Sequence, residues 1–205
     1  MPFAVLLVAA LTWQVAGHGP LYRWDTSADA AVLRLAAGRR AVAPVAQFWA
    51  DAGNVTVVLP VLALAVGYGA WRRRRRGGAR WWGPAVAQAV AMACALPLVV
   101  GLKALVARPA PGATRLVAHS GYFPSGHAVT AAVGYGLCVL ALAPGTAAAR
   151  RCLAGAAVLL NVAVGAALVW RGYHWPLDVA AGWALAAIVL EVTRRVVRSW
   201  WGSPG

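Results

Sequence analysis

The stretch Gly121-Tyr-Phe-Pro-Ser-Gly-His-Ala-Val129 marks the point where a polar, proline-rich loop gives way to a long apolar run. Its Pro-Ser-Gly entry predicts the beginning of a helix with Ser125 as the N-cap. Free backbone N–H groups and the helix dipole favour an anion at such an end. Gly126 removes side-chain bulk where an anion would approach, and His127 supplies a proton donor. A capped helix with an incidental histidine would look much the same, so the rest of the chain has to decide.

The composition predicts a membrane protein. Of the 205 residues, 61% are hydrophobic and only 12% are charged, with a mean hydropathy of +0.67. Ordinary soluble domains carry about 25% charged residues. One bundle of spanning helices would use nearly the whole length and leave no soluble domain to bind nucleic acid. The net charge of +14 is therefore attributed to membrane topology.

Six apolar segments are long enough, or nearly so, to cross a hydrocarbon core of about 30 Å as helices. We therefore expect an all-α integral membrane protein, a bundle of six transmembrane helices in one domain over residues 1–205. The first segment is short and could instead be a signal peptide, but no basic residue follows Met1, so we expect it to be retained. The expected segments are Pro2–Gly17, Val55–Trp71, Gly83–Val106, Gly126–Ala143, Cys152–Trp170 and Trp175–Val197.

A polar stretch, His18–Gly53, separates the first two segments. Apolar side chains at Val32, Leu33, Leu35 and Ala36 predict a short amphipathic helix at the membrane interface.

The basic residues predict the orientation of the bundle. With six alternating helices, eleven of the 19 basic residues fall on one side. The positive-inside rule places that side, both termini and an arginine-rich loop over residues 72–80 in the cytoplasm. The arginines of that loop would contact anionic lipid head groups. The eleven residues are Arg72 to Arg76, Arg80, Arg150, Arg151, Arg194, Arg195 and Arg198.

The opposite, extracytoplasmic ends of the last four segments carry the unusual polar residues. They are Lys103, Arg108, Ser125, His127, Arg171, His174 and Asp178. Snorkelling of long side chains at helix ends would account for the cations alone. Lys103, however, is the sole lysine among 19 basic residues, and lysine and arginine are not interchangeable at a tight site. Four segments that place their polar residues at one membrane surface predict an active site there.

These residue types suit phosphoryl transfer. Pro176 fits the first turn of a helix and places Asp178 beside His174, where a carboxylate holds a histidine in one tautomer. One histidine would attack phosphorus to form a phosphohistidine while the other protonates the leaving oxygen. Cations would neutralise the phosphate oxygens. No carboxylate cluster that would hold a metal is visible, so neither a metal nor another cofactor is expected.

Three stretches of the chain resemble the tripartite signature of the type 2 phosphatidic acid phosphatase superfamily, lipid phosphate phosphatases related to bacterial acid phosphatases and vanadium haloperoxidases. That signature reads Lys, six residues, Arg-Pro; then Pro-Ser-Gly-His; then Ser-Arg, five residues, His, three residues, Asp. The match at Pro124–His127 is complete, and the spacing from His174 to Asp178 is right. The resemblance covers residues 80–197, the expected phosphatase core, and implies a bundle of six spanning helices.

The family roles carry over to individual positions. The resemblance implies that His174 is the nucleophile, Asp178 orients it and His127 is the acid, with Lys103, Ser125 and the Gly126 backbone binding phosphate. Two departures concern the arginines. The family positions fall at Ala110 and Leu168, and the nearest arginines are Arg108 and Arg171. We expect these two to bind phosphate as substitutes, Arg171 because it lies about one helical turn beyond position 168.

The leading hypothesis is a membrane phosphatase that hydrolyses a lipid phosphate monoester or pyrophosphate at the extracytoplasmic face. Phosphatidic acid, phosphatidylglycerol phosphate and polyprenyl pyrophosphate are all possible substrates within the family, and membrane lipids are the expected surroundings. The alternative is a catalytically weakened member that binds or transports lipid phosphates, as the displaced arginines suggest. A vanadate-dependent haloperoxidase is disfavoured by the six spans and the small size.

Overall fold

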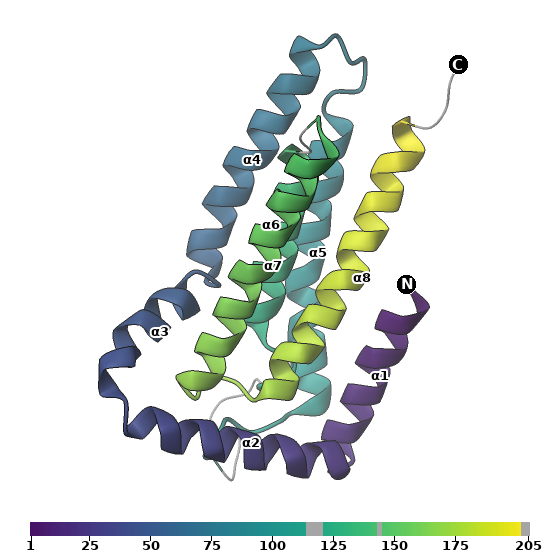
Figure 1. Cartoon of the computed structure of the whole chain (residues 1–205). Helices are drawn as coiled ribbons and strands as arrows, with labels where there is room; N and C mark the ends of the chain where they lie inside the picture. Colours follow the sequence, from purple (N-terminus) through teal and green to yellow (C-terminus); the bar gives the residue numbers. More distant parts are fainter. Residues whose placement is uncertain (114–120, 143–144, 202–205) are drawn as a thin grey trace.

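The computed structural model describes residues 1–113, 121–142 and 145–201, and within these ranges the chain is helical with no strand. In these described ranges, eight α-helices and one short 3-10 helix follow one another (Figure 1). Their bounds are α1 Pro2–Ala16, α2 Pro20–Ala37, η1 Arg40–Val42, α3 Ala43–Asp51, α4 Val55–Arg75, α5 Gly83–Val106, α6 Gly126–Leu142, α7 Ala147–Trp170 and α8 Pro176–Trp201.

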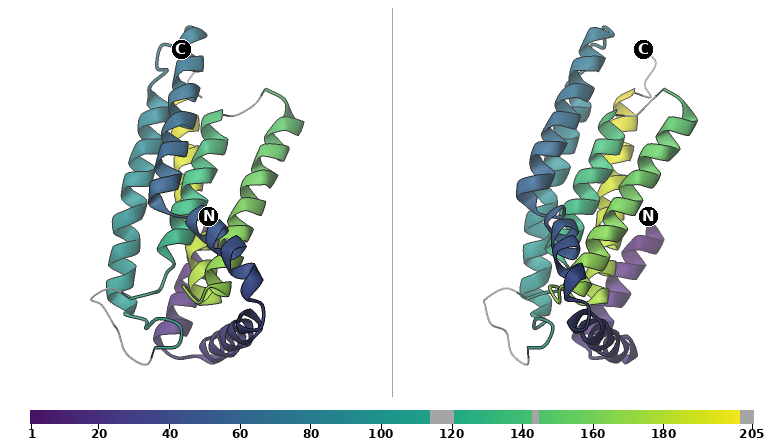
Figure 2. Two further views of the ribbon diagram at one scale, coloured as in Figure 1. Left: turned by 90° about the vertical axis from the view of Figure 1, so that its left-hand side faces the viewer. Right: turned by 60° about the vertical axis from the view of Figure 1, so that its left-hand side comes forward.

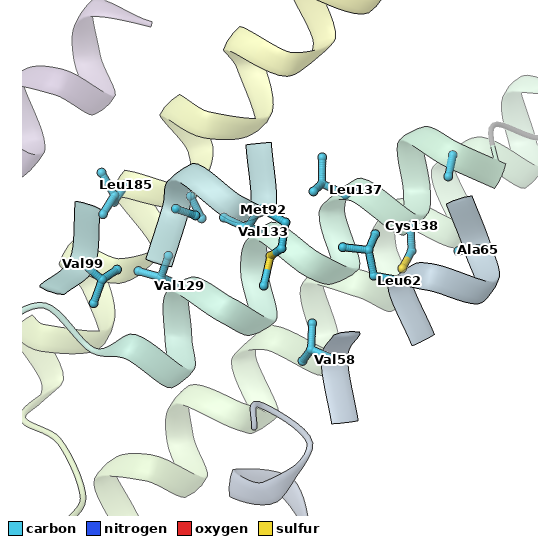
Figure 3. Close-up of a cluster of buried hydrophobic side chains, with 13 residues drawn as sticks. Val58, Leu62, Ala65, Met92, Val99, Val129, Val133, Leu137, Cys138 and Leu185 are labelled. Carbon is cyan, nitrogen blue, oxygen red and sulfur yellow. The ribbon is translucent and has the colours of Figure 1, made fainter. Parts of the chain in front are cut away.

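Helix α6 is the centre of the bundle and packs against α4, α5, α7 and α8 (Figures 1 and 2). It is apolar on all sides and rich in small residues, which suits a helix surrounded by others. At Gly134 an added Cβ would collide with Val58 of α4, so this glycine permits the close approach of the two helices. The buried side chains between α4, α5, α6 and α8 form one cluster, in which Met92, Val133 and Leu137 are prominent (Figure 3).

Helices α1, α4, α5, α6, α7 and α8 overlap the six predicted segments, but they differ from one another in whether they are long enough to span a membrane. Within the described residues, four helices are long and apolar enough to cross a membrane, namely α4, α5, α7 and α8. Counting the bent pair α1 and α2 as one span gives five, and α6 is apolar but has only 17 residues. An all-helical fold with four or five candidate spans is thus observed, and the count of six stays a prediction.

Three helix ends differ by about one turn or more from those expected, and one of them is the end of α8, which runs past Val197 to Trp201. Helix α4 continues past Trp71 to Arg75, because arginine is a good helix former and Arg72 also donates to the Leu142 carbonyl of α6. Helix α7 begins at Ala147, before the expected Cys152, because the Thr146 hydroxyl accepts the Ala149 amide at 3.2 Å as an N-cap. The expected end of the fourth segment, Ala143, lies outside the described residues.

Helices α2 and α3 lie at the end of the bundle opposite the arginines of α4 and α8 (Figures 1 and 2). The amphipathic helix predicted near residues 32–36 is present, but it extends back to Pro20. It bends by 79° from α1 at Gly17–Gly19, where His18 has a φ of 51°. Its inner side buries Asp25 and Asp29, which are 0% and 2% exposed. Helix α2 thus runs across the end of the bundle and presents two carboxylates to it.

Candidate active site

The three signature stretches meet at the end of the bundle that α2 covers. Helix α5 ends there with Ala107 in the left-handed conformation at a φ of 49°. The chain returns past this end so closely that a Cβ on Gly121 would lie 2.6 Å from the Lys103 carbonyl oxygen and 2.9 Å from the Arg108 nitrogen. The next residue, Tyr122, donates its amide to the Arg108 carbonyl at 2.9 Å. Because Gly121 has no side chain, the backbone before the second signature stretch can pack directly against the end of the first.

The N-terminus of α6 offers free amide donors. The Ser125 hydroxyl accepts the Ala128 amide at 3.2 Å, which confirms its prediction as the N-cap. The Ser125 amide donates to the Asp178 carbonyl at 2.9 Å and thereby attaches α6 to α8. Among the described residues, the amides of Gly126 and His127 have no acceptor. Two N–H groups at a helix N-terminus are thus available to an anion.

A pocket of about 600 Å³ opens beside this helix end. Its lining is partly polar and partly apolar, and the apolar side chains come from α4 and α5. The two histidine rings face the same space, with 6.3 Å between the centroids of His127 and His174. The polar lining comes from Asn54, Lys103, Tyr122, Gly126, His127, Thr130 and His174, and the apolar lining from Val55, Leu96, Val99 and Val100, with Gly53 and Gly121 completing it.

His174 is held by the carboxylate of Asp178. Its Nδ1 lies 3.4 Å from Asp178 Oδ2, and both residues are buried. The same Oδ2 accepts the Trp175 amide at 3.3 Å, because Asp178 lies in the first turn of α8. When Nδ1 carries the proton that faces the carboxylate, Nε2 keeps its lone pair for the pocket. This is the arrangement of an oriented nucleophile or base.

The structure turns Arg108 away from the pocket. Its Nη1 lies 2.7 Å from Asp178 Oδ1 and its Nη2 lies 2.7 Å from Asp25 Oδ2, and Arg108 is only 2% exposed. Arg108 does not line the pocket. Helix α5 ends before it, in the left-handed turn at Ala107, so its side chain leaves in a direction that helical spacing from Lys103 does not give.

Arg171 also lies outside the pocket. Helix α7 ends at Trp170, and Arg171 is exposed at its C-cap, where Nε donates to Gln47 Oε1 at 3.1 Å and Nη2 to the Tyr173 hydroxyl at 3.3 Å. Leu168, the position of the family arginine, is fully buried in an apolar cluster. Of the three predicted cations, the structure therefore brings only Lys103 to the pocket, and direct binding of phosphate by Arg108 or Arg171 stays a prediction.

The PAP2 superfamily model matches residues 84–201, which is more than half of the chain. The chain belongs to the PAP2 superfamily. The crystal structure of a transmembrane PAP2 type phosphatidylglycerolphosphate phosphatase from Bacillus subtilis has the same fold, with a TM-score of 0.74 and 24% sequence identity. The alignment covers 96% of this PAP2 protein and 93% of the Bacillus chain. A comparison with curated protein sequences gives no significant match. Family, fold and apolar helices together indicate a multi-pass membrane protein.

Burial sets the electrostatics of the carboxylates on α2, which lies across the bundle end. Loss of water raises the pKa of Asp25, and the Arg108 charge and the Leu177 amide oppose this rise. Burial, with the neighbouring Asp25 charge, raises the pKa of Asp29 to about 6. The Asp29 Oδ1 atom is buried and has no hydrogen-bond partner within the described residues. Asp29 of this PAP2 protein therefore has a buried oxygen without a partner, whereas both oxygens of Asp25 are hydrogen-bonded.

Sequence reasoning missed three contributors to the site. Tyr122 lines the pocket, with its ring 5.7 Å from that of His174 and 5.8 Å from Lys103 Nζ. Its place inside the stretch 121–129 was an available signal. Asn54 reaches the pocket from the turn before α4, and Asp25 reaches Arg108 from α2. Neither has a local signal, because only the tertiary fold brings these segments to the site. Within the described ranges, no three His, Cys, Asp or Glu side chains gather as a metal site would require.

Proposed function

We propose that this PAP2 protein is a phosphatase that hydrolyses a lipid-linked phosphate monoester or pyrophosphate through a phosphohistidine, without a metal. One observation carries the proposal: His174 is oriented by Asp178 and faces His127 across the pocket, at 6.3 Å between ring centroids. Both rings line the pocket, so a phosphoryl group between them would have a nucleophile on one side and a proton donor on the other. Family membership and the phosphatase of the same fold support a phosphatase activity.

The proposed reaction has two steps. First, His174 Nε2 attacks phosphorus, the bond from phosphorus to the lipid oxygen breaks, and His127 donates a proton to that oxygen. Second, His127 takes a proton from water, the resulting hydroxide attacks phosphorus, and the P–N bond breaks to release inorganic phosphate and free His174. Lys103 and the amides of Gly126 and His127 bind the phosphate oxygens in both steps. Ser125 holds this turn in shape through its N-cap, and its predicted direct contact with phosphate remains to be tested.

The pocket suits a substrate that stays partly in the bilayer. Its apolar wall consists of Val55 from α4 and Leu96, Val99 and Val100 from α5, two helices long and apolar enough to span a membrane. An acyl or polyprenyl chain would lie along this wall while its phosphate reaches Lys103. Phosphatidic acid, phosphatidylglycerol phosphate and polyprenyl pyrophosphate all meet this description.

The activity is tested by phosphate release from these three lipids, with the purified chain in detergent and a chelator present. We expect release by the wild type and a loss of at least about a thousandfold in His174→Ala. Protein quenched with denaturant at alkaline pH, where a P–N bond survives, should carry phosphate on a histidine, and His127→Ala should accumulate this phosphohistidine where the second step is slowed. Equal turnover in wild type and His174→Ala would contradict the mechanism.

The proposed orientation places both termini in the cytoplasm and the pocket at the extracytoplasmic face, because the arginines of α4, α7 and α8 lie at the opposite end. It is tested after replacing Cys94, Cys138 and Cys152 by alanine. A membrane-impermeant thiol reagent should label Arg171→Cys in intact cells and Arg76→Cys only after permeabilisation. The reverse pattern would invert the orientation.

A binding or transport protein is the second candidate. The specific observation in its favour is that neither Arg108 nor Arg171 lines the pocket, so Lys103 is the one predicted cation there. Saturable binding of lipid phosphate without release of inorganic phosphate would select this candidate over the enzyme.

A further inference from the structure

Arg108 links two buried carboxylates from distant parts of the chain. Its Nη1 contacts Asp178 Oδ1 and its Nη2 contacts Asp25 Oδ2, each at 2.7 Å. The three side chains are between 0% and 2% exposed. Asp25 lies outside residues 84–201, the range matched by the family. A buried charge requires partners, and each of these carboxylates has Arg108 as its counter-ion.

The surrounding contacts hold the Arg108 guanidinium in one place. Its Cζ lies 4.6 Å from the centre of the Trp175 ring and 5.1 Å from that of Tyr22. Trp175 is fixed in turn by its indole N–H, which donates to the Pro109 carbonyl at 3.0 Å. The other oxygen of Asp25 accepts the Leu177 amide at 2.8 Å, so Asp25 also caps α8 in the turn that carries Asp178.

We propose that Asp25 and Arg108 are a positioning pair that sets the geometry and the charge of Asp178 toward His174. The inference rests on the proposed function, in which Asp178 orients His174. Arg108 holds Oδ1 of Asp178, so that Oδ2 is the oxygen that faces His174 Nδ1 at 3.4 Å. Arg108 therefore acts on the reaction through Asp178 and makes no contact with the substrate.

Asp25 supplies the charge balance. With both carboxylates ionised, Asp25, Arg108 and Asp178 carry one net negative charge, which favours a positive charge on the His174 ring. Tyr122, His127 and Lys103 also face this ring, and they are the same in all the variants below. Without the charge of Asp25, the Arg108 cation would cancel that of Asp178. The effect reaches His174 because the three charges are buried and therefore only weakly screened. Removal of Asp25 and removal of Arg108 should therefore move the titration of His174 in opposite directions.

The experiment compares Asp25→Asn, Arg108→Gln and wild type as purified full-length protein in detergent. The ring nitrogens of labelled histidine are titrated by NMR, and His174 is assigned by the signal lost in His174→Gln. We expect the midpoint of the His174 titration to move to lower pH in Asp25→Asn and to higher pH in Arg108→Gln. Asp25→Glu, which keeps the charge, should stay near the wild-type midpoint and serves as the second variant if Asp25→Asn does not fold. Equal His174 midpoints in wild type, Asp25→Asn and Arg108→Gln would overturn the proposal.

Turnover of a lipid phosphate supplies the second measurement. We expect Asp25→Asn to lower kcat by roughly ten- to a hundredfold with KM within about twofold of wild type, because the substrate does not touch Asp25. Asp29→Asn is the matched control, because Asp29 lies on the same helix but has no hydrogen bond to Arg108. Its kcat should stay within about threefold of wild type. In the Arg108→Gln background, Asp25→Asn should have little further effect.

The two measurements separate failure of this inference from failure of the proposed function. Opposite shifts of the His174 midpoint without any phosphate release would uphold the positioning pair and reject the phosphatase. Phosphate release by wild type, with a raised KM and an unchanged kcat in Arg108→Gln, would make Arg108 a phosphate ligand and overturn the pair.

Discussion

Arginines occupy both ends of this helix bundle in opposite surroundings. At the end formed by α4, α7 and α8, arginines such as Arg75 and Arg76 are exposed, and Arg75 lies over the Trp71 ring at 5.4 Å. At the other end Arg108 is buried between two carboxylates. Four of the five acidic residues lie at that second end, namely Asp25, Asp29, Asp51 and Asp178. The first end is a cationic surface, and the second is a site of paired charges.

This difference separates two uses of the same residue type. An exposed arginine at a helix end interacts with water and lipid head groups, and its removal alters little else. A buried arginine compensates charges that would otherwise be isolated, and its removal leaves them uncompensated. Substitutions of arginine at the two ends should therefore have effects of different kinds and different sizes on stability and activity.

The largest effect is expected at Arg108. Arg108→Ala leaves Asp25 and Asp178 buried without their common counter-ion, which should lower the free energy of unfolding by roughly 3–5 kcal/mol. Unfolding of the purified protein by a denaturing detergent, followed by tryptophan fluorescence, measures this change. A loss below about 1 kcal/mol would show that the three charges are not coupled as their contacts suggest.

Lys103 comes next. Lys103→Met keeps the apolar stem and removes the one predicted cation that lines the pocket, so kcat/KM should fall by about a hundred- to a thousandfold. Arg171→Gln is the matched control at the same end, and its activity should stay within about twofold of wild type. A larger loss in Arg171→Gln than in Lys103→Met would mean that Arg171 reaches the phosphate in the working protein.

A smaller effect depends on pH. Because the folded state raises the pKa of Asp29 to about 6, the folded protein binds more protons than the unfolded chain between about pH 4 and pH 6. The free energy of unfolding should therefore fall as the pH rises through this window. Asp29→Asn should flatten that slope. Unfolding of both proteins, measured from pH 4 to pH 7, tests the sign of this slope. If the wild type gained stability relative to Asp29→Asn as the pH rises, the prediction would be wrong.

The smallest effect is expected at the arginine-rich end. Arg76 is exposed and lies just beyond α4, so Arg76→Ala should change the free energy of unfolding by less than about 0.5 kcal/mol. The measurement is the same detergent unfolding used for Arg108→Ala. A change comparable to that of Arg108→Ala would remove the contrast between the two ends.

The sequence predicted the parts of the site that depend on local chemistry. The N-cap of Ser125 follows from a Pro-Ser-Gly entry, and the pairing of His174 with Asp178 follows from a spacing of four residues at a helix start. Lys103 and His127 were placed at one end of the bundle because apolar segments of similar length alternate in direction. The structure brings Lys103, His127 and His174 to one pocket, with Ser125 and Asp178 directly behind Gly126 and His174.

The surroundings of the arginines were not predictable by spacing. Arg108 follows a left-handed residue, Ala107, so its direction depends on a backbone turn and not on a helical period. Arg171 is the C-cap of α7, where its exposed side chain bonds Gln47, whereas Leu168 is buried in an apolar cluster, and only the packing around α7 decides this. Asp25 contacts a residue 83 positions away, and no pattern within α2 marks it as different from Asp29. Contacts of this kind arise from the tertiary fold.

Because Asp25 caps α8, the matched family segment depends on a residue outside its own range. The segment common to the superfamily begins at residue 84, but the Leu177 amide and one half of the Arg108 guanidinium are satisfied by a side chain at position 25. A fragment cut at the family boundary would leave both groups without this partner. Transfer of the signature stretches to another scaffold would therefore have to include α2, or a replacement acceptor at the same place.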